Sequence, residues 1–322
     1  MKRHALLPLL LVCSVLFGIS AAVAEPPPTG PVASPSLTVE TIPQSPRMPA
    51  ATAGKSPPQQ DSFSIVPLGG STYAAIAKIG GKATSNAMFV IGAEYVVGVG
   101  AHMTKEVIAD LYAEIAYLTS KPIRYFVLAH HHSGYSHIDF DFPPGQDVIM
   151  AWQAWQDMNS AVRKPEYPVL FFNEGLTIKT GGATLVLTNV GRGHSIGDIV
   201  TLVPELGVVF ASDLLYVNSV GYMGGGYMRE WLLALDFLEE LGAEKIIPGT
   251  GPVCTVEEVR DFKEFFRAFL SDVLMRIELG QSLQQVLDEF DLPEYRHMYG
   301  YEQLIKANLE RAYTELKDEF GR

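Results

Sequence analysis

The chain has 322 residues, of which 48% are hydrophobic and 19% are charged. This composition is typical of a globular protein and excludes a collagen, a coiled coil or a fully disordered chain. The formal net charge is −12 and the sequence has no basic tract, so we expect no nucleic-acid partner. The two cysteines, Cys13 and Cys254, exclude a disulfide-rich scaffold and a zinc module built from cysteines.

Residues 1–24 have the pattern of a secretory signal peptide. Lys2 and Arg3 give a basic start, residues 5–22 are mostly apolar, and Ala22-Val23-Ala24 fits a small-residue cleavage site. We therefore expect an exported protein, periplasmic or secreted, that has no transmembrane span after cleavage. The alternative is an uncleaved anchor, because the apolar run is almost long enough to span a bilayer.

Residues 25–62 are predicted to form a disordered linker. The segment holds ten of the 21 prolines and few large apolar residues, so it cannot bury enough surface to offset the entropy lost on ordering. The remaining residues suit one large domain. We divide it into a core at 63–253 and a helical C-terminal extension at 254–322 that packs on the same domain.

The core is predicted to alternate short strands with a few helices, which suggests a layered α/β sandwich. Thr104 is the expected N-cap of the first helix, whose apolar residues recur at helical spacing. The expected helices cover residues 105–118, 151–161 and 230–241. The expected strands cover residues 63–68, 72–79, 87–91, 95–99, 123–129, 169–172, 183–190, 199–203, 208–211 and 245–247.

The C-terminal third is predicted to be helical. Thr255 with Glu258, and Ser282 with Gln285, have the spacing of capping boxes, and Gly280 is placed to end the helix between them. These helices could cover the sandwich or form the face of a homodimer, and the sequence does not decide between the two.

Histidines cluster after one of the buried strands. His130, His131 and His132 are contiguous, and His194 follows another strand. In an extended segment His130 and His132 point to the same side, so both could bind one zinc ion with His194 as a third ligand, leaving the fourth position to water. The alternative is that the triplet is a solvated polar loop.

The order of these features resembles the metallo-β-lactamase superfamily. That family has an H-x-H-x-D-H motif after a strand, a later histidine in a glycine turn, an aspartate after a further strand, and a last histidine in a G-H-G turn. The corresponding segments here are residues 130–135 (HHHSGY), 191–198 (GRGHSIGD), 208–215 (VVFASDLL) and 247–253 (IPGTGPV). The resemblance implies a four-layer αββα sandwich in which His130, His132, His194 and Asp213 bind metal.

The departures from the family pattern imply one zinc ion rather than two. Gly134, Tyr135 and Thr250 stand where the family has ligands of the second metal, and a glycine supplies no ligand atom. The change at Gly134 also removes an expected general base. Tyr135 and His137, which lie close by in sequence, are candidate catalytic residues together with Asp213, although each could also be an ordinary loop residue.

The leading functional prediction is a single-zinc hydrolase acting on an ester, lactone or amide of a small molecule. The first alternative is a non-catalytic descendant of the fold that binds a metal or a small ligand. The second is a serine hydrolase, because residues 193–197 spell G-x-S-x-G around Ser195. That motif requires a helix after the serine, whereas residues 199–203 are predicted to form a strand.

Overall fold

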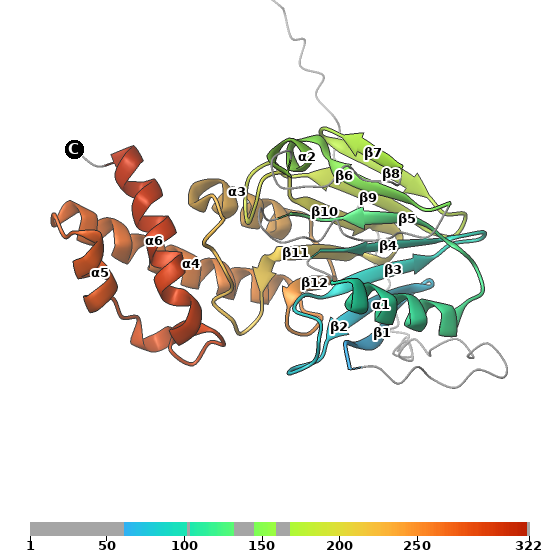
Figure 1. Ribbon diagram of the computed structural model, residues 1–322, viewed down its shortest axis with the longest axis horizontal. Coiled ribbons are helices and arrows are strands. Elements are labelled where there is room, and N and C mark those ends of the chain that lie inside the picture. Colours follow the sequence, from blue (N-terminus) through green and yellow to red (C-terminus); the bar gives the residue numbers. More distant parts are fainter. Residues whose placement is uncertain (1–60, 102–103, 132–144, 159–167, 321–322) are drawn as a thin grey trace, which may run out of the picture. The chain divides into compact units, whose positions relative to one another are not determined.

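Two mixed β-sheets form the centre of the part of the chain that the computed structural model describes, which is residues 61–101, 104–131, 145–158 and 168–320 (Figure 1). These residues belong to one compact unit of the chain, Ser45–Arg322. The predicted signal peptide and nearly all of the predicted linker lie outside the described residues.

The first sheet has its strands in chain order, antiparallel from β1 to β4 and parallel from β4 to β7. Its strands are β1 (Phe63–Gly69), β2 (Thr72–Ala77), β3 (Ala87–Ile91), β4 (Val96–Gly100), β5 (Ile123–Leu128), β6 (Asp147–Ala151) and β7 (Val169–Phe172).

The second sheet has the order β12-β11-β10-β9-β8, with β11 and β12 parallel and the other pairs antiparallel. Its strands are β8 (Gly175–Lys179), β9 (Thr184–Asn189), β10 (Ile199–Val203), β11 (Val208–Tyr216) and β12 (Lys245–Thr250).

Helices cover the outer faces of both sheets, which confirms the predicted four-layer αββα arrangement. Apolar side chains of the two sheets form one buried cluster between them. A second cluster joins the first sheet to α1 (Lys105–Leu118), whose N-cap is Thr104 as predicted. A third joins the second sheet to α3 (Met228–Glu240) and α4 (Val256–Glu278). Burial of these apolar faces supplies most of the driving force for the layering.

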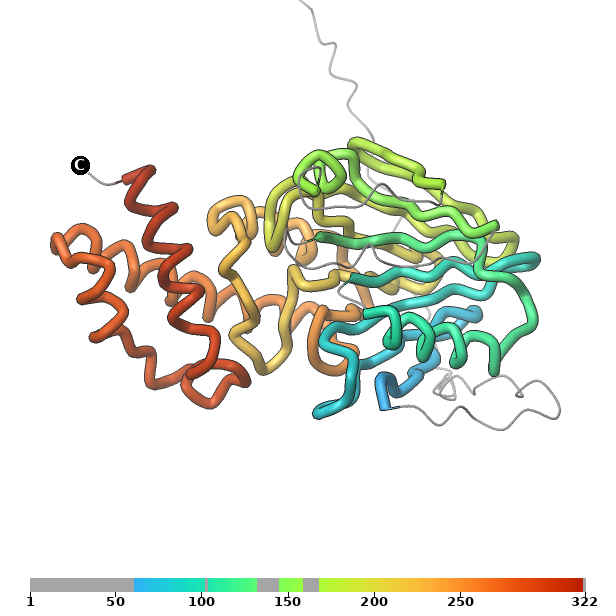
Figure 2. The backbone as a smooth tube through the Cα atoms, viewed as in Figure 1, coloured from blue at the N-terminus to red at the C-terminus, as the bar shows by residue number. Residues whose placement is uncertain are grey.

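The C-terminal third is helical, as predicted. After α4 come α5 (Leu283–Glu289) and α6 (Tyr301–Phe320), drawn in orange and red in Figures 1 and 2. Both predicted capping boxes are present at the starts of α4 and α5, and Gly280, two residues after α4, adopts a φ of +76°. No described helix combines the length and the apolar composition that a bilayer-crossing segment needs.

Several predicted elements need correction. The strands β6 and β8 were not predicted, and the helix expected at 151–161 begins at Trp152 and is described as far as Met158. The strand expected at 208–211 is longer and runs to Tyr216, because β11 keeps pairing with β12. Asp213 therefore lies inside a strand rather than after one.

Candidate metal centre

His130, His194 and Asp213 meet where the two sheets adjoin. His130 follows β5 of the first sheet by two residues, His194 lies in the turn between β9 and β10, and Asp213 lies within β11. A backbone hydrogen bond joins the end of β5 to the start of β10, since the Ile199 N–H donates to the Ala129 carbonyl over 2.7 Å. All three side chains are buried. The fold thus brings together residues that are far apart in the sequence, since 83 positions separate His130 from Asp213.

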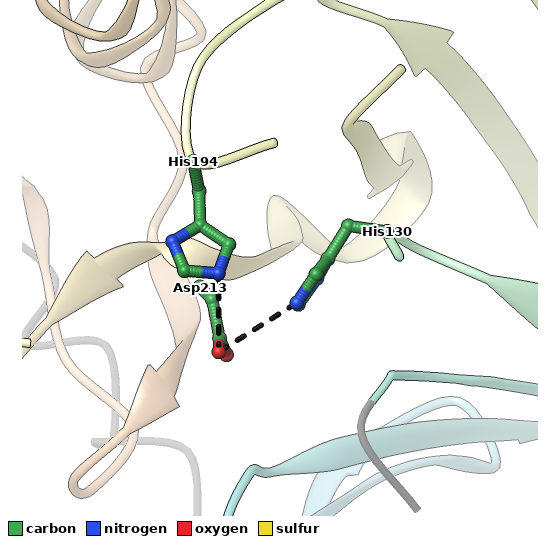
Figure 3. Close-up of side chains that lie close together, drawn as sticks. All are labelled: His130, His194 and Asp213. Carbon is green, nitrogen blue, oxygen red and sulfur yellow. Dashed lines mark ion pairs between the residues drawn. The ribbon is translucent and has the colours of Figure 1, made fainter. Parts of the chain in front are cut away.

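The ligand atoms of these residues converge (Figure 3). The Nε2 atoms of His130 and His194 each lie 3.7 Å from Oδ2 of Asp213. One ligand atom from each residue can be chosen so that all lie within 4.8 Å of one another. Two atoms bound to one tetrahedral zinc at about 2.0–2.1 Å would be roughly 3.3 Å apart, so small side-chain movements would suffice to bind an ion here.

Asp213 is held by groups from the segment just before β3 and from β12. The Ser85 hydroxyl donates to Oδ1 of Asp213 over 3.0 Å, which leaves Oδ2 toward the histidines. Gly249 of β12 lies so close that a Cβ built on it would be 2.1 Å from Oδ1. Asn86 fixes this part of β12, because its backbone N–H donates to the Gly249 carbonyl and its side chain to the Pro248 carbonyl.

The second nitrogen of each histidine also has a partner. Nδ1 of His130 shares a hydrogen bond of 3.1 Å with the Ser212 hydroxyl, and Nδ1 of His194 lies 3.4 Å from the Tyr216 hydroxyl. The ring of Trp231 packs edge-on against His194, with centroids 5.1 Å apart. When Nδ1 is hydrogen-bonded, Nε2 is the nitrogen left for a metal.

Burial governs the electrostatics of the site. Burial raises the pKa of Asp213 to about 7. The hydrogen bond from Ser85 lowers this pKa, whereas the nearby Asp198 carboxylate raises it. Burial likewise raises the pKa of Asp198 to about 6 and that of Tyr216 well above its ordinary value. A buried carboxylate is costly unless a cation or hydrogen-bond donors compensate its charge. The donor set of two imidazoles and a carboxylate therefore fits a divalent ion such as zinc.

The comparisons with known proteins agree with this architecture. Residues 113–250 match the family model described as the metallo-beta-lactamase superfamily. The chain has the metallo-β-lactamase fold. This confirms the resemblance on which the prediction of the αββα sandwich depended. No curated protein sequence matches the chain.

Solved structures of the same fold share little sequence with this metallo-β-lactamase-fold chain. A metallo-β-lactamase from Pontibacter korlensis is similar at a TM-score of 0.56 and 17% identity, over 64% of this chain and 99% of that one. A metallo-β-lactamase from Hirschia baltica has a TM-score of 0.53 and 18% identity, over 64% of this chain and 98% of that one. The mono-zinc form of the metallo-β-lactamase FIM-1 from Pseudomonas aeruginosa has a TM-score of 0.53 and 19% identity, over 66% of this chain and 98% of that one.

The structure brings together part of the predicted metallo-β-lactamase-type site. His130, His194 and Asp213 form a buried group that could bind one metal ion. The remaining predicted residues, His132, Tyr135 and His137, lie outside the described residues, and so does Gly134. Thr250, where the family has its last histidine, is the final residue of β12.

Ser195 has the surroundings of a structural residue. It is buried, its hydroxyl and its backbone N–H both donate to the Asp198 carboxylate, and the next element is the strand β10. A nucleophile elbow needs an exposed serine hydroxyl before a helix. The geometry therefore gives no support to the serine-hydrolase alternative.

Four residues that support the candidate ligands were not predicted from the sequence, namely Ser85, Ser212, Tyr216 and Gly249. Ser85 and Asn86 are two polar residues just before an apolar strand, which was a usable signal. Ser212 and Gly249 lie within the segments quoted for the family resemblance, but no local pattern marks either of them, or Tyr216, as a support.

Proposed function

We propose that the protein is a hydrolase that uses one zinc ion to cleave an ester, lactone or amide of a small molecule. The observation that supports it is the convergence of two imidazole nitrogens and a carboxylate oxygen within 4.8 Å at a buried position of this fold. In the proposal His130, His132 and His194 hold the ion, and Asp213 is a further ligand or orients the attacking water.

The metal would supply Lewis-acid polarisation of the substrate carbonyl and a water of pKa about 7. The chain's own residues prepare the site for it. Ser85 donates to Oδ1 of Asp213, so Oδ2 remains available for the ion or its water. The rings of His130 and His194 are nearly perpendicular, with centroids 4.7 Å apart, which aims both Nε2 atoms at the same region. Tyr135 and His137 remain proposed catalytic residues.

A single ion fits the residues better than a pair. Thr250 and Gly134 replace ligands of the second metal in the family pattern; threonine is not a common zinc ligand, and glycine has no side chain to bind one. The FIM-1 metallo-β-lactamase, which has the same fold, was solved in a mono-zinc form, so the fold can hold one zinc ion. We extend this stoichiometry to the present chain as part of the proposal.

The first test is the metal content of the purified protein by elemental mass spectrometry. We expect about one zinc per chain, lost in His194→Ala and retained in His297→Ala, because His297 is exposed and lies outside the site. Zinc should also raise the melting temperature of the wild type by mass action, and a chelator should reverse the rise. A protein that neither contains zinc nor takes it up would refute the proposal.

The second test separates catalysis from binding. Wild-type protein and Asp213→Ala are assayed against a p-nitrophenyl ester, a γ-lactone and a chromogenic β-lactam. Turnover lost in Asp213→Ala while zinc is retained would support a catalytic role for Asp213, and loss of both would make it a ligand.

The alternative function is that of a non-catalytic protein that binds a metal or a small ligand. The change at Gly134, where the family has a candidate general base, favours it. Its expected result is a zinc-loaded wild type with no turnover on any substrate class, combined with the same loss of zinc in His194→Ala.

A further inference from the structure

Ser212 has a strained backbone next to the candidate metal centre. Its φ is +53°, a region in which residues other than glycine are uncommon. The other non-glycine residues with positive φ among those described are Ser71 and Asn218, and both are exposed, whereas Ser212 is buried. Glycine would adopt this conformation without strain, so the serine side chain must contribute something that glycine lacks.

The strained backbone turns two consecutive side chains toward one histidine. In a regular strand the side chains of residues 212 and 213 would point to opposite faces of the sheet. Here the register of β11 against β12 shifts between Phe210 and Ser212. The Ser212 hydroxyl thus reaches Nδ1 of His130 at 3.1 Å, while Oδ2 of Asp213 lies 3.7 Å from Nε2 of the same ring.

We propose that Ser212 is a positioning residue that prepares His130 to bind the metal. A neutral imidazole carries one N–H, and a nitrogen that binds a metal must have no proton. When Nε2 faces the ion, the proton is on Nδ1 and is donated to the Ser212 hydroxyl, which fixes the tautomer and the ring orientation. This inference rests on the proposed metal site.

The test uses two substitutions that both remove the hydroxyl but differ in backbone strain. Ser212→Gly relieves the positive φ, and Ser212→Ala retains it. Ser71→Gly is the matched control, because Ser71 is an exposed serine with a φ of +63° in the turn between β1 and β2, far along the chain from the site. Zinc affinity is measured by competition with a chromophoric chelator, and the melting temperature is measured on metal-free protein.

We expect both Ser212 variants to bind zinc about tenfold or more weakly than the wild type, whereas Ser71→Gly binds it equally well. Metal-free Ser212→Gly should melt at a higher temperature than Ser212→Ala, because only the alanine variant keeps the strain. A purely structural role predicts a different result, in which zinc affinity follows the melting temperature instead of the hydroxyl. Nitrogen-15 NMR of the zinc-loaded wild type should show His130 protonated at Nδ1.

Two outcomes overturn the inference, and they are distinguishable. A wild type that takes up no zinc overturns the metal site and this inference together. If the wild type binds zinc, His194→Ala abolishes that binding, and both Ser212 variants keep full affinity, then the role of Ser212 alone is overturned.

Discussion

At the scale of single residues, the candidate centre depends on a small side chain beside Asp213. A Cβ at position 249 would lie 2.1 Å from Oδ1 of Asp213, which is far inside van der Waals contact. No positive φ is found at Gly249, so its requirement is space rather than backbone freedom.

Gly249→Ala should therefore displace the Asp213 carboxylate. We expect the free energy of unfolding to fall by about 1–3 kcal/mol, the usual cost of overpacking, and zinc affinity to fall at least tenfold. Gly182→Ala is the control, because the same Cβ at position 182 would meet nothing within 4 Å. Thermal unfolding and a zinc titration check both effects. Unchanged zinc binding in Gly249→Ala would show that Asp213 is not a ligand at its observed position.

The sequence was sufficient to predict three residues of the candidate centre but not the groups that hold them in place. His130, His194 and Asp213 were predicted because each follows an apolar run in an order that resembles a known family. Ser85 contacts Asp213 across 128 residues of chain, and the role of Ser212 depends on a positive φ inside a strand. No local pattern encodes either, because the Ser85 contact joins the segment before β3 to a strand of the other sheet and the φ of Ser212 accompanies a register shift between β11 and β12.

At the scale of elements, α3 and α4 are joined by a network of ion pairs. Glu239 of α3 pairs with both Lys263 and Arg260 of α4, and the Arg260 bond is 2.7 Å long. The Lys263 ammonium, followed by the Arg260 guanidinium, lowers the pKa of Glu239 from its ordinary value of 4.5 to about 2. The network adds electrostatic pairing to the apolar contact between the two helices.

Glu239→Gln should destabilise the fold in a pH-dependent way. Because the pKa is lower in the folded state, the ionised carboxylate stabilises the fold fully above about pH 4.5, and this contribution is lost as the pH falls toward 2. The urea midpoints of wild type and variant should therefore differ most at pH 7, and the difference should narrow as the pH falls from about 4.5 toward 2. High salt should also reduce the difference, since the groups are partly exposed.

Glu240→Gln is the control for this substitution, since no ion pair of Glu240 is found among the described residues. A difference between wild type and Glu239→Gln that stays constant from pH 7 to pH 3 would show that packing rather than charge explains the effect.

Elements with strong local signals were predicted best. The helix at 105–118 and the capping boxes of α4 and α5 were confirmed, because caps and apolar stripes are encoded within a few residues. The strand β8 was missed because exposed residues alternate along it at the edge of its sheet. The full length of β11 was missed because its second half contains Asp213, whose burial depends on tertiary contacts.

At the scale of the whole described unit, α6 contacts the loop between β11 and α3, residues 217–227. The buried Asn308 of α6 accepts from the Met223 N–H over 2.7 Å and donates to the Gly221 carbonyl over 3.0 Å. Further along this loop, the Tyr227 N–H donates to the carbonyl of Gly193, the residue before His194. A chain of contacts thus connects α6 with the turn that carries a candidate ligand.

The ring of Tyr227 strengthens this connection. The guanidinium of Arg192, in the turn that carries His194, and that of Arg311, in α6, lie 4.9 Å and 5.2 Å from the centre of the ring. Such cation–π contacts contribute about 0.5–1 kcal/mol each at exposed sites. They place a side chain of the C-terminal extension and a side chain of the turn that carries His194 against one residue, which argues that the extension and the turn fold together.

Asn308→Ala tests whether the C-terminal extension and the turn that carries His194 are coupled. Two buried backbone groups of the loop lose their partner, so we expect the free energy of unfolding to fall by about 1–3 kcal/mol. Zinc affinity should also fall, because the loop supports the Gly193 carbonyl next to His194. Lys306→Ala, on the exposed face of α6, should change neither quantity by a comparable amount. If the C-terminal helices formed an independent unit instead, Asn308→Ala would leave zinc affinity at the wild-type value and split thermal unfolding into two transitions.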